Sequence, residues 1–244
     1  KEASEYASEI RRTVRYLGVS DGNMQEGSLR CDVNISVRKG PNAPFGTKVE
    51  IKNMNSFSAI QKACDYEIAR QIEVYENGGK IFQETRLWDE AKQLTKSMRM
   101  KEGSSDYRYF PDPDLGPIEI TKAQKEIWLK ELPELPSKKR NKYVSEFGLS
   151  AYDARVISDE INMANFFEET VANGAEAKLA SNWVTSDIVG YLKANKLSFS
   201  DLKLSPENLS EMISLISNNT ISGKIAKEIL PELIQKNISP KKLV

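Results

Sequence analysis

Two runs of alternating apolar and polar residues constrain the fold of this chain more than any other feature. They cover residues 29–38 and 47–52, and a loop rich in glycine, proline and asparagine separates them. A period of two predicts half-buried strands, and the loop predicts that the strands form a hairpin. One face of the first strand would be apolar, and the other would carry Arg30, Asp32, Asn34, Ser36 and Arg38.

The polar face of this hairpin has two interpretations. Most alternating strands expose such a face to water and carry ion pairs between neighbouring strands. The same residues could instead line a cleft, with Glu50 and Lys52 of the second strand beside Asp32 of the first. Periodicity alone favours the solvated surface.

Charge and composition exclude several classes of protein. Lys plus Arg and Asp plus Glu both total 35, so the chain as a whole is not a basic nucleic-acid-binding protein, and any RNA contact must come from local patches. The absence of histidine excludes Ser/His/Asp catalysis and argues against a zinc site formed from Cys31 and Cys64, which we expect to be packed free thiols. No apolar run approaches the length of a membrane span, so we expect a soluble protein of a reducing compartment.

The first part of the chain mixes helices with strands. Residues 1–17 have helical spacing from the first residue, with no starting methionine, so we expect a piece of a longer protein. A long helix is predicted after Asn55 or Ser56, either of which could cap it, with an apolar stripe of Phe57, Ile60, Cys64, Ile68, Ile72 and Tyr75. It should cover the apolar face of the sheet. Further strands are predicted at residues 81–88, 94–100 and 117–120.

From Thr121 the pattern changes to short helices. Residues 121–124 resemble a capping box, and Ser205 and Pro206 resemble the cap and first residue of a later helix. We therefore predict an α+β fold in three parts. Residues 1–120 would form a mixed or antiparallel sheet with a packed helix, residues 121–204 an all-helical domain, and residues 205–244 the start of a small helical tail domain.

Long polar strings in a fixed order resemble one known family. They lie at residues 25–36, 48–56, 83–86 and 98–114, and together they resemble the B subunit of the glutamyl/aspartyl-tRNA amidotransferases. Residues 151–156 and 182–184 resemble the helical domain of the same subunit, so the resemblance extends past the sheet.

The resemblance implies an ATP- and Mg²⁺-dependent ligase. In this family a cradle-shaped domain activates the side-chain carboxylate of Glu-tRNA(Gln), and often of Asp-tRNA(Asn), as an acyl phosphate. Ammonia derived from glutamine then displaces the phosphate. The implied partners are the misacylated tRNA, which the helical and tail domains hold, the amidase (the A subunit) and the small C subunit. The implied compartment is the bacterial cytoplasm or the stroma or matrix of an organelle.

The resemblance also suggests roles for individual residues, since acyl phosphate formation requires fixed cations and metal-binding acids. The expected catalytic residues are Arg30, Asp32, Asn34, Glu50 and Lys52. The expected metal ligands are Glu26, Asp32 and Glu50, and the expected phosphate- or ATP-binding residues are Arg99 and Arg108. Lys224 and Lys227, at the start of a helix in a locally basic stretch, are the expected tRNA contacts. A solvated helix face is the alternative for these two lysines.

The chain departs from the family pattern in one respect. The family carries a Glu-x-His-type metal site in an N-terminal portion, and neither that portion nor any histidine is present here. We therefore expect a partial site and no activity from this chain alone. The alternative function is a non-catalytic helical RNA-binding or adaptor protein whose sheet is scaffolding. Another kind of ATP-dependent ligase is disfavoured by the lack of a Gly-rich phosphate loop.

Overall fold

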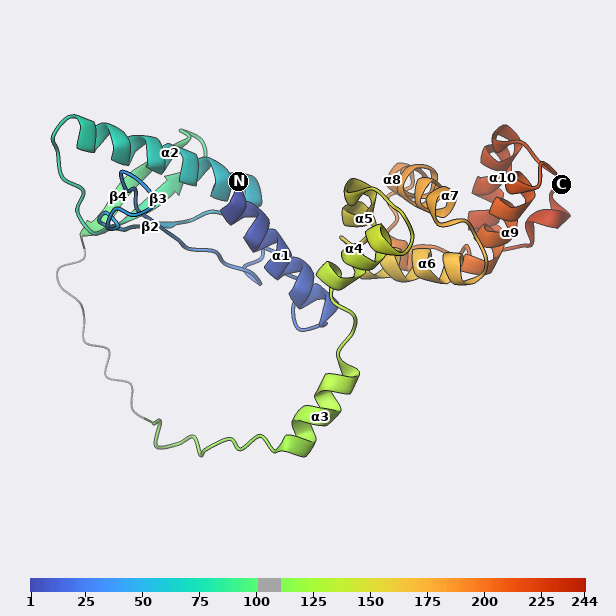
Figure 1. Ribbon diagram of the computed structural model, residues 1–244, viewed down its shortest axis with the longest axis horizontal. Helices are drawn as coiled ribbons and strands as arrows, with labels where there is room; N and C mark the ends of the chain where they lie inside the picture. The colour runs from blue at the N-terminus through green and yellow to red at the C-terminus, as the bar shows by residue number, and fades with distance from the viewer. Residues whose placement is uncertain (101–110) are drawn as a thin grey trace. The chain divides into compact units, whose positions relative to one another are not determined.

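The chain forms two compact units. The computed structural model describes the backbone of residues 1–100 and 111–244 and the side chains of residues 1–98 and 111–244. Unit 1 is Lys1–Leu132 and unit 2 is Pro133–Val244 (Figure 1). Unit 1 combines helices with a four-stranded sheet and the described part of unit 2 is helical, which confirms the predicted α+β class. The finer division at residues 120 and 204 stays a prediction.

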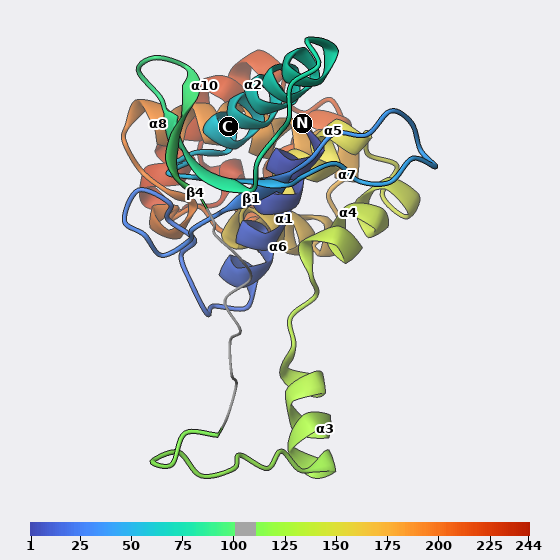
Figure 2. The ribbon, with the colours of Figure 1, turned by 90° about the vertical axis from the view of Figure 1, so that its left-hand side faces the viewer.

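The sheet of unit 1 has the strand order β1-β2-β3-β4. β1 (Val33–Ile35) and β2 (Val49–Lys52) pair antiparallel, which confirms the predicted hairpin. β3 (Glu84–Asp89) lies parallel to β2, and β4 (Leu94–Met100) returns antiparallel to β3. A parallel pair needs a crossover connection. Helix α2 (Phe57–Glu76) provides it, and Figures 1 and 2 show this helix lying along one face of the sheet.

Two strand predictions were wrong in extent or in kind. The first strand is confined to residues 33–35, where β2 supplies a partner, although alternation continues from residue 29 to residue 38. Residues 117–120 form no strand and are exposed. Pro117 lacks a backbone N–H, and no described strand lies beside this segment. A strand forms only where a neighbouring strand pairs with its backbone, and the alternation of one segment does not show whether such a neighbour exists.

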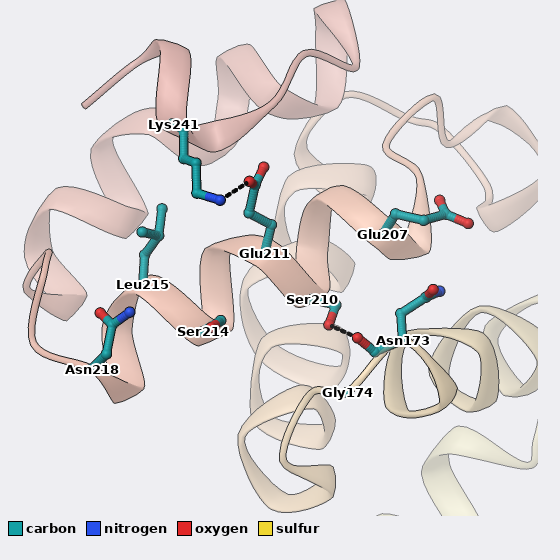
Figure 3. A pocket seen from close by; sticks show the side chains of 9 residues that line it. All are labelled: Asn173, Gly174, Glu207, Ser210, Glu211, Ser214, Leu215, Asn218 and Lys241. Carbon is teal, nitrogen blue, oxygen red and sulfur yellow. Dashed lines mark hydrogen bonds and ion pairs between the residues drawn. The ribbon is translucent and has the colours of Figure 1, made fainter.

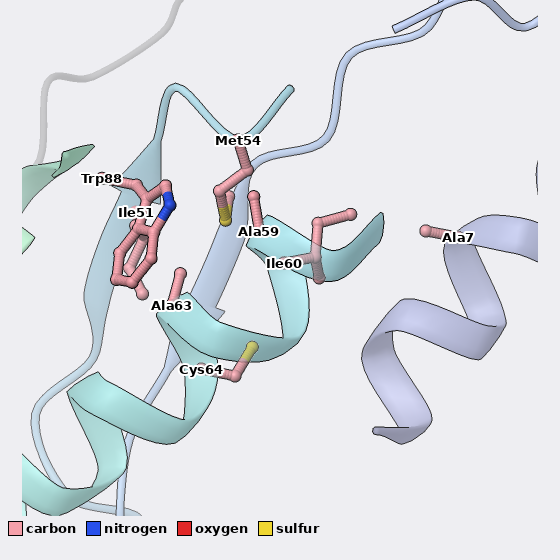
Figure 4. Packing of buried hydrophobic residues seen from close by; sticks show 8 residues of the cluster. All are labelled: Ala7, Ile51, Met54, Ala59, Ile60, Ala63, Cys64 and Trp88. Atoms are coloured by element: carbon pink, nitrogen blue, oxygen red, sulfur yellow. The ribbon is translucent and has the colours of Figure 1, made fainter. Parts of the chain in front are cut away.

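The core of unit 1 lies between α2 and the sheet. The hydroxyl of Ser56 caps α2 by accepting from the amide of Ala59 at 3.0 Å, as its sequence predicts. The apolar cluster shown in Figure 4 joins α2 to β2, β3 and helix α1 (Glu2–Tyr16). It consists of Ala7, Ile51, Met54, Ala59, Ile60, Ala63, Cys64 and Trp88.

The predicted stripe of α2 is right only in its first half. Ile60 and Cys64 are buried, but Ile68, Ile72 and Tyr75 are 37%, 42% and 38% exposed. Steps of four residues advance about 40° beyond a full turn, so an i, i+4 series turns steadily away from the sheet. The buried face continues instead through Glu67 and Gln71, which are both 0% exposed.

The remaining helices confirm the prediction that the chain continues as short helices from Thr121. Helix α3 (Lys122–Glu131) begins with the capping box of Thr121 and Gln124 and buries no residue. Unit 2 contains α4 (Pro136–Ser145), α5 (Ala151–Ile157), α6 (Ile161–Ala172), α7 (Ala177–Asn182), the π-helical segment η1 (Trp183–Ile188), α8 (Val189–Ala194), the short 3₁₀ turns η2 (Phe199–Asp201) and η3 (Pro240–Lys242), α9 (Pro206–Ser217) and α10 (Gly223–Lys236). Among the helices that the structure describes, none has both the length and the apolarity to cross a bilayer.

The packing of α2 predicts a contrast between two isoleucines of the same helix. Ile60→Ala should lower the free energy of unfolding of unit 1 by about 2–5 kcal/mol, because the side chain is fully buried. Ile72→Ala should change it by less than about 0.5 kcal/mol, because Ile72 is 42% exposed. Hydrogen exchange of the α2 and β2 amides in urea measures this stability separately from that of unit 2. Equal losses would show that α2 packs through the stripe predicted from its sequence.

Candidate functional site

The face of the sheet opposite α2 brings three predicted site residues together. Ile51 points into the core below α2, so its neighbours Glu50 and Lys52 lie on the other face. The Lys52 ammonium lies 2.9 Å from a carboxylate oxygen of Asp32 and 3.9 Å from one of Glu50. The predicted cross-strand ion pair is therefore present, with one cation between two acids.

Cross-strand register extends this cluster into a row. Asn34 of β1 stands opposite Glu50 of β2, and Glu50 stands opposite Thr85 of β3. The Thr85 hydroxyl donates a hydrogen bond of 2.8 Å to the Glu50 carboxylate, and Thr85 is fully buried. Residues directly opposite one another belong to the same face of a sheet, so Asn34, Glu50 and Thr85 form one row. In the backbone ladder, residue 99 of β4 is in turn the register partner of Thr85. The side chain of Arg99 lies outside the described residues, and its role in phosphate binding stays a prediction.

Thr85 is the member of this row that sequence reasoning missed. The string at residues 83–86 contributes to the family resemblance, but its threonine has no charge to suggest a role. The alternation of Glu84, Thr85 and Arg86 within a strand is the signal that could have found it. Glu84 and Arg86 bond each other on the helix side at 2.7 Å, which leaves Thr85 to face Glu50.

An open pocket lies at the β1 end of the row. Its cavity volume is about 530 Å³, and its lining includes Asn34, Phe45, Lys48 and Gln83. Phe45 is 77% exposed, and the guanidinium carbon of Arg38 lies 4.7 Å from the centre of its ring. The pocket thus combines an exposed aromatic ring with one lining cation, Lys48, and the guanidinium of Arg38 lies against that ring from outside the lining.

Position 46 in this pocket requires glycine, because its backbone passes close to the carbonyl oxygen of Val37. Its amide donates to the carbonyl oxygen of Val37 at 3.2 Å. A Cβ at this position would lie 2.5 Å from that same oxygen, so a larger residue would push the loop away from Val37.

The other predicted site residues are not drawn into the row. Glu26 and Arg30 are exposed in the segment before β1, and Arg108 lies outside the described residues. Within residues 1–98 and 111–244, no three His, Cys, Asp or Glu side chains are placed so that they could hold a metal ion. The acids Glu26, Asp32 and Glu50 therefore do not by themselves fit Mg²⁺, and their role as ligands stays a prediction.

The two predicted tRNA contacts differ in their surroundings. Lys224 is exposed at the start of α10. The Lys227 ammonium forms an ion pair of 2.9 Å with Asp187 of η1 and lies 6.0 Å from the centre of the Trp183 ring. Lys227 therefore also joins α10 to the π-helical segment.

Unit 2 has a polar pocket of its own, shown in Figure 3, with a cavity volume of about 340 Å³. The Lys241 ammonium pairs with Glu211 at 2.9 Å, and the Ser210 hydroxyl donates to the carbonyl of Asn173. Hydrogen bonds from Ser239 and Lys241 hold the pKa of the Glu211 carboxyl below its usual value. These groups satisfy one another and tie η3 to α9.

The protein has paired charges on one face of a small mixed sheet, and a helical unit follows this sheet along the chain. Comparison with family models identifies this class: residues 1–126 match the GatB/GatE catalytic domain, and residues 165–244 match the GatB domain. The chain therefore belongs to the GatB/GatE family, as the sequence resemblance indicated.

Close relatives carry a more particular name. Over all 244 residues the chain is 94% identical to the B subunit of the aspartyl/glutamyl-tRNA(Asn/Gln) amidotransferase of Prochlorococcus marinus (strain MIT 9312) and covers 50% of it. It is 95% identical to the protein of the same name from strain AS9601, with the same coverage. Identity to the Synechococcus sp. (strain CC9605) protein is 70%, with 49% of that protein covered. The chain thus spans about half the length of the curated relatives that it matches.

The pKa of Glu84 predicts a pH-dependent contribution to stability. Burial disfavours the charged carboxylate, but hydrogen bonds from Ser97 and Arg86 outweigh it and hold the pKa below its usual value. The contribution is therefore complete above the unfolded-state pKa of about 4.3 and is lost as pH falls through the lower folded-state pKa. Glu84→Gln should lower Tm at pH 7, and its difference from wild type should shrink below about pH 4.

Thermal unfolding between pH 7 and pH 3 measures this difference. Glu126→Gln is the control, because Glu126 is exposed on α3 and should leave Tm unchanged throughout. A Tm difference for Glu84→Gln that stays constant with pH would show that ionisation of Glu84 does not stabilise the fold.

Proposed function

We propose that this chain is part of the B subunit of a tRNA-dependent amidotransferase, in which it contributes to activating the side-chain carboxylate of Glu-tRNA(Gln) or Asp-tRNA(Asn). Glutamine-derived ammonia then amidates the activated carboxylate. The observation that carries this proposal is the row of Asn34, Glu50 and Thr85, with Lys52 paired to Asp32 beside it. The names of the relatives support the choice of substrates.

The proposed partners and compartment follow from the same assignment. We propose that the chain works with the misacylated tRNA, with the amidase (the A subunit) and with the small C subunit. The proposed compartment is the bacterial cytoplasm.

The polar row is suited to chemistry on anions. Lys52 is a fixed cation that can compensate charge on a phosphate or on the substrate carboxylate. Its side chain is 36% exposed, and exposed ion pairs are weak enough for an incoming anion to compete with Asp32. The Asn34 amide can orient a carboxylate or ammonia by hydrogen bonding. Thr85 keeps the Glu50 carboxylate in place while these partners change.

We propose ATP as the phosphate donor, and the open pocket supports this choice. The ring of Phe45 can stack on an adenine base through the face that Arg38 does not cover, and Lys48 of the pocket lining can bind phosphate oxygens. When bound, ATP supplies the phosphoryl group that activates the carboxylate. Mg²⁺ remains a proposed cofactor, although the described acids do not form a site for it.

A catalytic role fits the sheet better than the alternative, a non-catalytic RNA-binding or adaptor protein. Both functions are compatible with a helical unit that contacts tRNA. A scaffold sheet, however, does not require a buried threonine hydroxyl bonded to a carboxylate on the face opposite the core.

Two isosteric substitutions test the row. In the full-length protein, Asp32→Asn and Glu50→Gln should lower ATP-dependent activation on the order of 10–100-fold if they act through neighbouring groups. Loss of a direct contact to the reacting phosphate would cost ~10²–10³-fold. The measurement is formation of the activated intermediate from ATP and misacylated tRNA. Asp65→Asn, an exposed change on α2, is the control. Full activity in both site variants would restore the solvated-surface interpretation.

A second test concerns the lysines of α10. Lys224→Ala combined with Lys227→Ala should weaken tRNA binding and reduce its salt dependence by roughly one to two units of slope, if each lysine neutralises a phosphate. The rate at saturating tRNA should remain near that of wild type. Binding is measured over a range of salt concentrations.

Matched variants separate the two roles of Lys227. Asp187→Asn releases Lys227 from its ion pair and should preserve or strengthen tRNA binding. Lys236→Ala, whose ammonium pairs with Glu232 on the same helix, should leave the slope unchanged. An unaltered affinity and slope in the double lysine variant would leave only the solvated-face interpretation.

A further inference from the structure

A fully buried carboxylate lies on the side of the sheet that faces α2. Glu67 is 0% exposed. Its two oxygens accept hydrogen bonds from the Arg70 guanidinium, from the Gln71 amide at 3.0 Å and from the Thr95 hydroxyl at 3.0 Å. A buried charge is tolerated only when it is paired and hydrogen-bonded in this way. The proposed chemistry makes no use of Glu67.

The bonds of Glu67 continue into both strands at the edge of the sheet. The Thr95 hydroxyl that donates to Glu67 accepts from Arg86 at 2.8 Å, and the same guanidinium donates to the Thr95 carbonyl at 2.8 Å. Arg86 also bonds Glu84 at 2.7 Å, and the Ser97 hydroxyl donates to Glu84. Two acids and two arginines therefore balance each other across α2, β3 and β4.

This network lies beside an irregularity in the β3–β4 ladder. Arg86 pairs with Ser97, but the preceding residue, Thr85, pairs with Arg99, so Met98 is passed over. In a regular antiparallel ladder Met98 would stand opposite Thr85. A bulge of one residue changes which side of the sheet the following positions belong to. The bulge therefore keeps Ser97 opposite Arg86 on the helix side and sets the backbone of residue 99 opposite Thr85, which belongs to the row with Glu50 and Asn34.

We propose that Glu67 and Thr95 are positioning residues that hold β4 in this bulged register. The inference rests on the proposed function, because the row is the site that the register serves. Glu67 cannot reach the row directly, since Arg86 and Thr85 are consecutive and point to opposite faces. Its hydrogen bonds act through the strands. A buried ionic network adds little net stability, and fixing one register among alternatives is its best-attested use.

The first test is a double-mutant cycle across the sheet. Thr95→Val removes the hydroxyl that joins Glu67 to Arg86 and keeps the size of the side chain and the charge of Glu67. Thr85→Val removes the bond to Glu50 on the other face. In the complete complex of the full-length protein with its partner subunits, each variant should lower kcat/KM for ATP about 10-fold or more per folded complex, the scale of a lost supporting contact.

Coupling between the two threonines is the expected result. If Thr95 acts by placing the row, the variant carrying both changes should be no worse than Thr85→Val alone, within about twofold. Hydrogen exchange of the β4 amides at residues 94–98 should also rise in Thr95→Val and in Glu67→Gln. Thr13→Val, which removes a hydroxyl bonded within α1, is the control for both measurements.

Two other outcomes overturn the inference in different ways. If the losses of the two single changes multiply in the double variant, or if β4 exchange is unchanged, Glu67 and Thr95 do not position the row. If Thr85→Val and Glu50→Gln both keep full activity, the row itself is not the site. In that case the proposed function of this face fails together with the inference.

Discussion

The crossover of α2 over one face of the sheet is the constraint on which the rest of unit 1 depends. β2 and β3 are parallel, so the chain must pass from one end of the sheet to the other between them. α2 makes this passage and seals Ile51 and Trp88 beneath it. Because the helix covers that face, the opposite face is the one left to carry Glu50, Lys52 and Thr85.

The two faces of the sheet hold their charges in different ways. Below α2, Glu67 and Glu84 are matched by Arg70 and Arg86; Glu67 is fully buried and the other three side chains are at most 20% exposed, so the geometry is tightly specified. On the other face, the ion pair of Lys52 with Asp32 is partly open to water, where such pairs are weak and exchangeable. A buried network on one side of the sheet thus supports a side whose exposed ion pair a charged ligand could displace.

Unit 2 also has an exposed ion pair, and it joins α10 to a π-helical segment. α7, η1 and α8 follow one another without a break, and the π-helical segment carries the aspartate that pairs with Lys227 of α10. Irregular π segments are frequent at functional sites. Lys227 is 63% exposed, so its ion pair with Asp187 is weak, and on the proposed function a tRNA phosphate competes for the same ammonium.

Some features of this protein follow from the sequence by itself. Alternation in residues 47–52 determined a strand with Glu50 and Lys52 on its polar face, and Thr121 determined where α3 begins. For α2 the sequence offered two caps, Asn55 and Ser56, and the structure has Ser56. The polar strings determined the family. Each of these signals is local, because a residue's face or capping role depends on its near neighbours in the chain. The roles proposed for Glu26 and Arg30 came from the resemblance, and both residues are exposed outside the row.

Other features were decided only by tertiary structure. The sequence could not show that Glu67 and Gln71, rather than Ile68 and Ile72, face the sheet, because the direction of the buried face is set by what the helix packs against. Nor could it show that Thr85 stands between Glu50 and position 99, because register depends on pairing between segments distant in the chain and on a bulge of one residue. Periodicity assigns residues to faces within an element, and only the partner element decides which face is buried and which residues meet.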